Sequence, residues 1–130
     1  MANNGADFTL TFRRLCDPVA DPEDNAAARM LFADPTAYDA WAARWHQRLY
    51  EDNTDPDARC AAMRAANPAV IPRYHIVEAA LDAAVARQNF SLSEELLDVL
   101  SRPYEDRPGY ERYAVPPAPE ERVRQTFCGT

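Results

Sequence analysis

The stretch that decides the fold is DPTAYDAWAARWHQRLYE, residues 34–51. Its large apolar side chains recur at intervals of three and four residues, which is the repeat of one helix face: Tyr38, Trp41, Trp45 and Leu49. Asp34 can accept hydrogen bonds from the first free N–H groups, and Pro35 suits the first helical position because it has no N–H. We therefore predict a helix over residues 35–51 whose aromatic stripe is core rather than a ligand pocket.

Asp-Pro pairs recur at Asp17-Pro18, Asp21-Pro22 and Asp55-Pro56, and the last two of these predict helix starts. Asn67-Pro68 ends a helix, since the residue before proline avoids the α region. A capping-box pattern, Ser91-Leu92-Ser93-Glu94, opens another. With the apolar periodicity, these signals predict five further helices, over residues 7–15, 23–33, 56–66, 74–88 and 91–101.

The apolar positions at helical spacing predict the inward face of each helix. In chain order they are Phe8, Phe12 and Leu15; Ala27, Met30 and Leu31; Cys60 and Met63; Val77, Leu81, Ala84 and Val85; and Leu92, Leu96, Val99 and Leu100. In the first segment, the alternation of Phe8, Leu10 and Phe12 also fits a strand, so that alternative stays open.

Five prolines interrupt the chain after Arg102, and no helix of useful length is expected before a last helical turn over residues 119–124. Tyr104, Tyr110 and Tyr113 are expected to anchor this stretch, with rings on apolar surface and hydroxyls toward water. The predicted fold is all-α. It is a compact bundle of about six short helices over residues 1–102, with a proline-rich irregular C-terminal extension over 103–130 that ends in a Cys-containing tail.

The composition excludes several kinds of site. The 130 residues carry a formal charge of −7, and all 14 basic side chains are Arg, so the chain has no Lys. It therefore has no P-loop lysine, no kinase-type ATP lysine and no Schiff-base lysine. Because phosphate neutralisation supplies most nucleic-acid affinity, an acidic chain without clustered Arg is not expected to bind nucleic acid.

The expected location is the cytoplasm. The first residues lack the basic and apolar regions of a signal peptide. No apolar stretch approaches the ~20 residues that span a bilayer, so no membrane partner is expected. Cys16, Cys60 and Cys128 are odd in number and widely spaced, which argues against a secreted disulfide framework.

Few residues are candidates for chemistry. His46 and His75 stand far apart with no CxxC or HxxxH pattern, so no metal site is predicted. Carboxylate pairs such as Glu94-Glu95 and Glu120-Glu121 lie near expected helix starts, where the helix dipole accounts for them. We assign no catalytic residue to this chain.

The cysteines fall into two kinds. Cys16 and Cys60 lie on or beside apolar helix faces, where cysteine behaves as a small hydrophobe. Cys128 is the third residue from the C-terminus, in a segment with little regular structure to bury it. Taken alone, it is either a tail thiol without a role or a functional thiol that can reach a partner sulfur without straining a helix.

Four blocks of sequence, in order, resemble the C-terminal region of the selenoprotein O family. They are GADFTLTFR at residues 5–13, NPAVIPR at 67–73 followed by VEAAL at 77–81, RPY at 102–104, and YAVPP at 113–117 with the terminal FCGT at 127–130. Together they span nearly the whole chain. One departure is Tyr74, where the family usually has Asn after the Pro-Arg pair, so a polar role at that position is not expected to carry over.

This resemblance implies a function for a longer protein. Family members resemble protein kinases in fold and act as protein adenylyltransferases, which move AMP from ATP, with a divalent metal such as Mg, onto hydroxyl side chains of proteins. The nucleotide-gripping, metal-binding and catalytic residues of the family lie upstream of the region that this chain resembles. The chain is therefore expected to be a C-terminal fragment with no cofactor of its own, whose partners are the N-terminal kinase-like part and the protein substrates.

The resemblance also bears on Cys128. The matching residue is selenocysteine in some eukaryotic members and Cys in bacterial ones, and the family implies that it pairs oxidatively with a cysteine of the kinase-like part. A structural and redox-regulatory role for the fragment follows. Two alternatives stay open: a self-standing helical module that docks a partner or dimerises, and a small thiol redox protein that uses Cys128.

Overall fold

The computed structural model describes residues 1–17 and 26–122, and within these ranges the chain forms helices and no strand. The predicted all-α class is confirmed. The chain divides into two compact units, Met1–Ala69 and Val70–Thr130, each with its own apolar core. No helix in the described ranges combines the length and apolar character that crossing a membrane requires.

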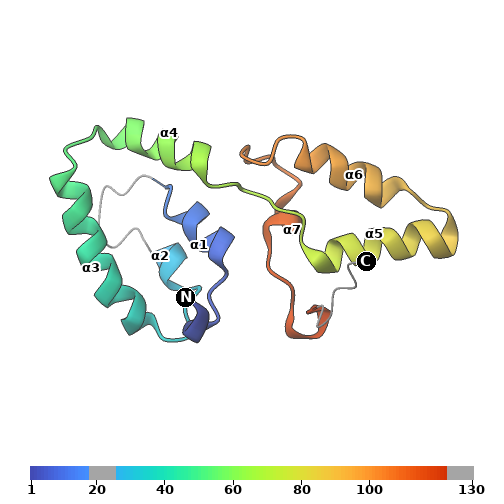
Figure 1. Ribbon diagram of the computed structural model, residues 1–130, viewed down its shortest axis with the longest axis horizontal. Coiled ribbons are helices and arrows are strands. Elements are labelled where there is room, and N and C mark those ends of the chain that lie inside the picture. Colours follow the sequence, from blue (N-terminus) through green and yellow to red (C-terminus); the bar gives the residue numbers. More distant parts are fainter. Residues whose placement is uncertain (18–25, 123–130) are drawn as a thin grey trace, which may run out of the picture. The chain divides into compact units, whose positions relative to one another are not determined.

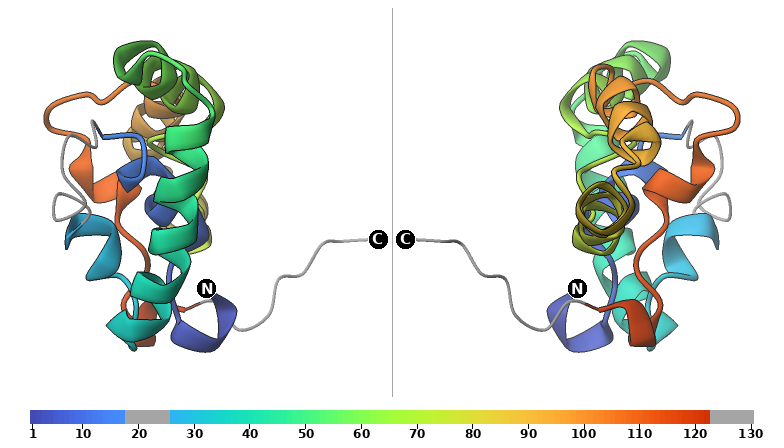
Figure 2. Two further views of the ribbon diagram at one scale, coloured as in Figure 1. Left: turned by 90° about the vertical axis from the view of Figure 1, so that its left-hand side faces the viewer. Right: turned by 90° about the vertical axis from the view of Figure 1, so that its right-hand side faces the viewer.

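Within residues 1–17 and 26–69, the first unit contains a short 3₁₀ turn and four α-helices (Figure 1). The elements are η1 (Ala2–Asn4), α1 (Phe8–Arg14), α2 (Ala26–Arg29), α3 (Pro35–Glu51) and α4 (Pro56–Ala66). The left view of Figure 2 shows α3, in teal to green, as one uninterrupted helix. The bounds of α3 and α4 are those that the sequence predicts, and α1 settles the helix-or-strand alternative in favour of a helix.

Aspartates cap three of these helices. The Asp34 carboxylate accepts a hydrogen bond from the Thr36 N–H at 3.0 Å, and Asp55 accepts one from Ala58 at 2.9 Å. Asp7 caps α1 in the same way, through the Leu10 N–H at 2.8 Å. The Asp-Pro pairs at 34 and 55 are thus confirmed as helix starts, whereas Asp21-Pro22 lies outside the described residues.

The core of the first unit forms where α1, α2 and α3 meet. Its buried residues are Leu15, Ala28, Tyr38 and Ala42, with Phe12, Phe32, Trp41, Trp45 and Met63 packed against them. The Trp41 and Trp45 rings stack with centroids 5.4 Å apart. The aromatic stripe of α3 is therefore core, as predicted, although Phe8 at the start of α1 remains 68% exposed beside Phe12.

A buried arginine joins α1 to the end of α4. Arg13 is 9% exposed, and its Nη1 donates to the carbonyl oxygens of Arg64 at 3.2 Å and Asn67 at 2.9 Å. These carbonyls belong to the last turn of α4, which has no further turn to bond them. A cation at a helix C-terminus also complements the helix dipole.

The predicted second helix ends earlier than residue 33 and turns a different face inward, while its predicted start at residue 23 lies outside the described residues. Within the described part, α2 covers only Ala26–Arg29, and Ala28 is its buried residue instead of Ala27, Met30 and Leu31; Met30 is 81% exposed. After Ala28 the backbone turns more tightly than an α-helix, because the N–H groups of Leu31 and Phe32 donate to carbonyl oxygens three residues earlier. Asn4 then holds the turn, accepting from the N–H groups of Ala33 and Asp34.

The second unit contains α5 (Tyr74–Arg87), α6 (Ser91–Leu100), α7 (Glu111–Ala114) and η3 (Pro119–Glu121). Helices α5 and α6 lie antiparallel (Figure 1) and are joined through Gln88, whose φ of 50° is left-handed. The capping box at Ser91–Glu94 is wrong. Phe90 is the N-cap residue, and the Asn89 side chain accepts from the Ser91 N–H at 3.1 Å, which leaves Ser91 inside the helix.

The core of the second unit draws on the proline-rich stretch. Val70, Leu96, Val99 and Tyr113 are its buried residues, with Ile76, Val77, Leu100, Tyr110 and Ala114 around them. Tyr113 is 1% exposed, so it is more deeply placed than a surface anchor, whereas Tyr104 is 48% exposed.

The loop between α6 and α7 is held to α6 by Arg107. Its Nη2 lies 2.6 Å from Asp98 Oδ2, and its guanidinium covers the Tyr110 ring at 4.3 Å. The hydrogen bond from Arg107 keeps the pKa of Asp98 below its usual range.

The inward face predicted for α5 is confirmed at Val77, which packs on the core, and is wrong at Leu81 and Val85. Ala80 and Ala83 are buried, whereas Leu81 is 53% and Val85 84% exposed. The rotation of α5 about its axis is set at its first turns. There the buried Arg73 donates from Nη2 to the Ala114 carbonyl oxygen at 2.9 Å, and Ile76 and Val77 pack on the core. The face predicted for α6 is confirmed at its two buried residues, Leu96 and Val99.

Candidate functional site

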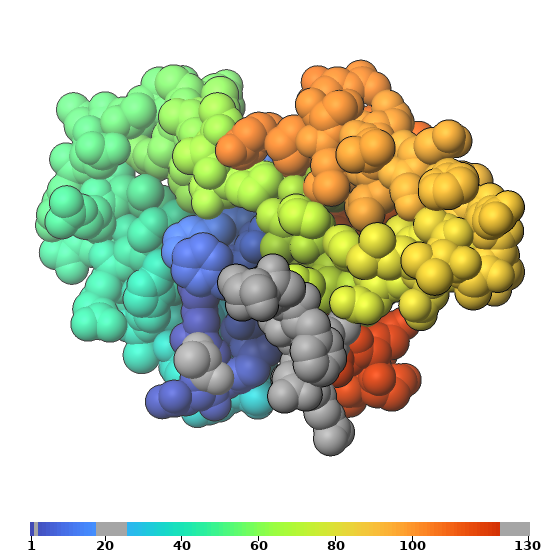
Figure 3. Space-filling view, turned by 45° about the vertical axis from the view of Figure 1, so that its right-hand side comes forward, coloured from blue at the N-terminus to red at the C-terminus, as the bar shows by residue number. Residues whose placement is uncertain are grey.

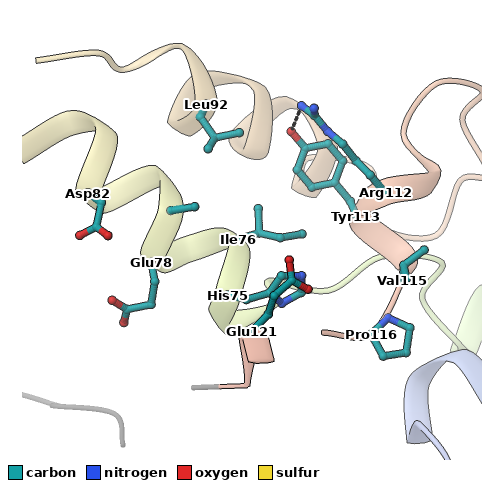
Figure 4. Close-up of a pocket in the computed structure, with 11 residues that line it drawn as sticks. His75, Ile76, Glu78, Asp82, Leu92, Arg112, Tyr113, Val115, Pro116 and Glu121 are labelled. Atoms are coloured by element: carbon teal, nitrogen blue, oxygen red, sulfur yellow. Dashed lines mark hydrogen bonds between the residues drawn. The ribbon is translucent and has the colours of Figure 1, made fainter. Parts of the chain in front are cut away.

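The second unit has a pocket of about 670 Å³ between α5, the start of α6 and the α7 segment (Figure 4). This volume lies within the range of small-molecule and peptide-side-chain sites, roughly 300–1,000 Å³. Its apolar lining residues are Ile76, Ala79, Leu92, Tyr113, Val115 and Pro116, and its polar ones are His75, Glu78, Asp82, Arg112 and Glu121.

Helix α5 supplies one wall because four of its lining residues share a face. His75, Glu78, Ala79 and Asp82 follow one another at spacings of three, one and three residues. The opposite wall is held in place by Arg73, whose hydrogen bond to Ala114 joins the start of α5 to the end of α7. One buried guanidinium therefore joins the two elements that form these walls.

Arg112 is already engaged within the protein. Its Nη2 donates to the Tyr113 hydroxyl at 2.8 Å and lies 2.6 Å from a Glu95 carboxylate oxygen, while its guanidinium covers the Tyr113 ring (Figure 4). Burial raises the pKa of the Tyr113 hydroxyl, which stays protonated at neutral pH. Arg112 is paired with Glu95, and among the described residues the carboxylates of Glu78, Asp82 and Glu121 make the rim of the pocket acidic.

His75 lies at the centre of the view in Figure 4, beside Glu121. Its Nδ1 is buried and has no hydrogen-bond partner within the described ranges. A buried ring nitrogen without a partner is costly, and an incoming donor or acceptor relieves that cost. An apolar floor with an acidic rim suits a ligand that has an aliphatic stem and a cationic head.

The residues singled out from the sequence fall elsewhere or remain apart. Cys128 lies outside the described residues. His46 is in the first unit, where its ring contacts Trp45, and His75 is in the second. In the part of the chain that the structure describes, no three His, Cys, Asp or Glu side chains gather as a metal ion needs.

Cys16 and Cys60 have structural surroundings. Cys16 is 1% exposed, and its Sγ donates to the Phe12 carbonyl at 3.1 Å, while the Cys60 thiol donates to the Cys16 carbonyl. Both are free thiols. Burial raises the pKa of Cys16, which disfavours its reactive thiolate.

Tyr74 begins α5 and is 63% exposed. It lines a smaller hollow of about 380 Å³ with Ile71, Pro72, Arg73 and Pro117. The structure therefore gives Tyr74 a surface position next to the NPAVIPR block.

Sequence reasoning missed the pocket as a site. The helical spacing of His75, Glu78 and Asp82 was visible and could have marked one polar face. The other wall, around Tyr113, lies more than 30 residues further along the chain, and no local pattern connects it to α5.

Comparison with known proteins finds relatives that match the whole of this chain. No family model matches the chain. All 130 residues of this chain align with protein nucleotidyltransferase YdiU of Rhodopseudomonas palustris (strain BisB5), with 55% identity, and with that of Nitrobacter hamburgensis, with 54% identity. The chain covers 26% of the length of each of these two proteins. The YdiU of Methylorubrum populi is 53% identical over 136 residues, 27% of its length. The chain thus spans about a quarter of the length of the curated relatives it matches. These matches confirm the resemblance drawn from the four sequence blocks: over its whole length the chain is similar to about a quarter of the length of proteins that the selenoprotein O family comprises.

Proposed function

We propose that this chain is the C-terminal helical part of a protein nucleotidyltransferase that transfers AMP from ATP to hydroxyl groups of other proteins. The observation that carries the proposal is identity of 51–55% over the full 130 residues to proteins named protein nucleotidyltransferase YdiU, of which the chain covers 26%. In this proposal ATP and Mg bind to the remaining three-quarters of the longer polypeptide, and the chain works in the cytoplasm beside its catalytic part.

The pocket in the second unit does not suit ATP. A triphosphate needs cations or free backbone N–H groups, whereas the rim presents the carboxylates of Glu78, Asp82 and Glu121. Its one arginine, Arg112, is paired with Glu95. No lysine is available anywhere in the chain. We therefore derive no catalytic step from these residues.

The role proposed for the chain itself is to brace the catalytic part. Each unit has a buried arginine that fastens one helix to the end of another, Arg13 in the first unit and Arg73 in the second. Buried and hydrogen-bonded charges fix a single arrangement, because breaking such a contact strands a charge away from water. Two units whose helices are joined in this way by a buried arginine are suited to support the catalytic part of the longer polypeptide.

Cys128 is proposed to regulate the transfer of AMP by the longer polypeptide. Its thiol and a cysteine thiol of the kinase-like part would form one S–S bond, passing two electrons and two protons to a peroxide, which is reduced to water. Reduction by a cellular dithiol would reverse the step. The support is the resemblance of the terminal Phe127-Cys128-Gly129-Thr130 block to the family.

A hybrid protein tests the proposed function. In the hybrid, this chain replaces the region of the R. palustris relative that it matches, and transfer of AMP from labelled ATP to protein is followed by gel. The hybrid should label protein, whereas the relative without that region, and this chain alone, should not. Loss of labelling in the hybrid, with the relative itself active and the hybrid folded, would count against the proposal.

A further inference from the structure

Helix α5 carries a second apolar face, turned away from the core of its unit. Tyr74, Leu81 and Val85 are spaced seven and four residues apart and so lie along one side of the helix. They are 63%, 53% and 84% exposed. Figure 3 shows the α5 segment, in yellow-green to yellow, at the surface of the second unit. We call these three residues the outer face of α5.

The outer face explains why the sequence predicts burial where the structure shows exposure. The core side of α5 is formed by Ile76, Ala80 and Ala83, so the helix is apolar on two sides. A helix that is apolar on more than one side is typical of an element covered from both directions. Single exposed apolar residues need no explanation. Three exposed apolar residues along one side of a helix form a patch, which is typical of an interface.

The charged side chains that α5 itself places beside the outer face are acidic, whereas Arg122 lines a hollow with Tyr74 at one end of that face. Glu78 and Asp82 are exposed side chains of the same helix, and Figure 4 shows both at the edge of the pocket. The helix has no basic side chain before Arg87, in its last turn. A surface of this kind is complementary to an apolar surface edged by Arg or Lys.

The length of the relatives indicates where that surface lies. The chain covers 26% of them, so about three-quarters of such a polypeptide is outside the structure. We infer that the outer face of α5 docks on an apolar, basic-edged surface of the remaining part of the same polypeptide. This inference rests on the proposed function in that it takes the chain to be part of a longer nucleotidyltransferase.

A second copy of the chain fits the face less well. In a two-fold symmetric pair, the same patch meets itself, so Glu78 and Asp82 from both copies would enter one interface. Like charges in an interface are unfavourable. The apolar contact would therefore be opposed by four carboxylates.

Hydroxyl-radical footprinting tests the inference without relying on activity. Oxidation of Tyr74, Leu81 and Val85 is measured by mass spectrometry in this chain alone and in the hybrid protein defined above. Their oxidation rates should fall several-fold in the hybrid, because burial removes them from solvent. Equal rates in the two proteins would overturn the inference.

A double variant, Leu81→Ser with Val85→Ser, gives a second readout. In this chain alone it should leave the thermal midpoint nearly unchanged, since both side chains are already exposed. In the hybrid it should lower the midpoint and restore fast oxidation of Tyr74. Tyr50→Ser is the control, because Tyr50 is 88% exposed in the first unit. An equal effect of the double variant and the control in the hybrid would contradict the inference.

Two further outcomes separate the possibilities. If this chain alone sediments as a dimer and the double variant makes it a monomer, a second copy occupies the face and the inference is wrong. If the hybrid fails to transfer AMP but protects the outer face, the docking stands and the proposed function fails. If the hybrid transfers AMP but leaves the outer face unprotected, the proposed function stands and the docking fails.

Discussion

Replacing Tyr113 with alanine should destabilise the second unit and leave the stability of the first unit unchanged. Tyr113 is 1% exposed and lies among Val70, Leu96 and Val99. Removing a buried aromatic ring costs about 3–5 kcal/mol, from lost transfer energy and the cavity left behind. In a unit of this size, each kcal/mol lowers the midpoint by about 4–8 °C, so we expect a decrease of at least about 12 °C.

The two tryptophans make this measurement specific. Both Trp41 and Trp45 lie in α3 of the first unit, so their fluorescence follows that unit, whereas far-UV circular dichroism follows both. In Tyr113→Ala, part of the dichroism signal should melt early while the fluorescence transition stays in place. Tyr113→Phe is the matched control and should cost less than about 1 kcal/mol, since Arg112 keeps its Glu95 partner. A small effect of Tyr113→Ala, or an equal shift of the fluorescence transition, would refute the reasoning.

Three further predictions concern a cap, a charge pair and a thiol. Asp55→Ala should destabilise the first unit by about 1 kcal/mol in urea unfolding followed by Trp fluorescence, while Asp55→Asn, which also caps, should stay within a few tenths. Arg107 depresses the folded-state pKa of Asp98, so the pair stabilises the fold above the ordinary carboxyl pKa and this contribution is lost as the pH falls through the folded-state pKa. The urea midpoint should therefore decline less between about pH 6 and pH 3 in Asp98→Asn than in the unchanged chain. An equal decline in both would argue against a stabilising Asp98–Arg107 pair. Alkylation of Cys16, followed by mass spectrometry, should be much slower in the native chain than in the urea-unfolded chain, because the thiol is buried and its pKa is raised. Equal alkylation rates would place Cys16 at the surface.

The sequence predicts those elements whose signals are local. Helices α3 and α4 begin at Asp-Pro pairs, where the cap and the proline act within one turn, and their bounds agree with the prediction. The aromatic stripe of α3 is core because a repeat over seventeen residues determines one face. Such features depend on residues that are neighbours in the chain.

What the sequence misses depends on distant partners. The rotation of α5 is set by Arg73 bonding to Ala114, a contact across 41 residues that no periodicity reveals. After α2 ends at Arg29, the turn before α3 is bonded by Asn4, 30 residues from Asp34 along the chain. The pocket combines α5 with Tyr113 in the same way, and so its two walls could not be joined from spacing alone.

The error at α5 has a physical interpretation of its own. The apolar repeat predicts that Leu81 and Val85 are covered, and in this chain they are not. In our proposal the repeat describes the helix in the longer polypeptide, where both sides of α5 have neighbours. The same sequence pattern then carries information about a surface that this chain does not contain.

Calorimetric titration with Mg-ATP tests the central claim most directly, because the claim separates nucleotide chemistry from this chain. The hybrid protein should give saturable heat on titration, and this chain alone should give only the heat of dilution at matched concentration. Saturable binding of Mg-ATP by the 130 residues alone would place a nucleotide site within these helices and contradict the account.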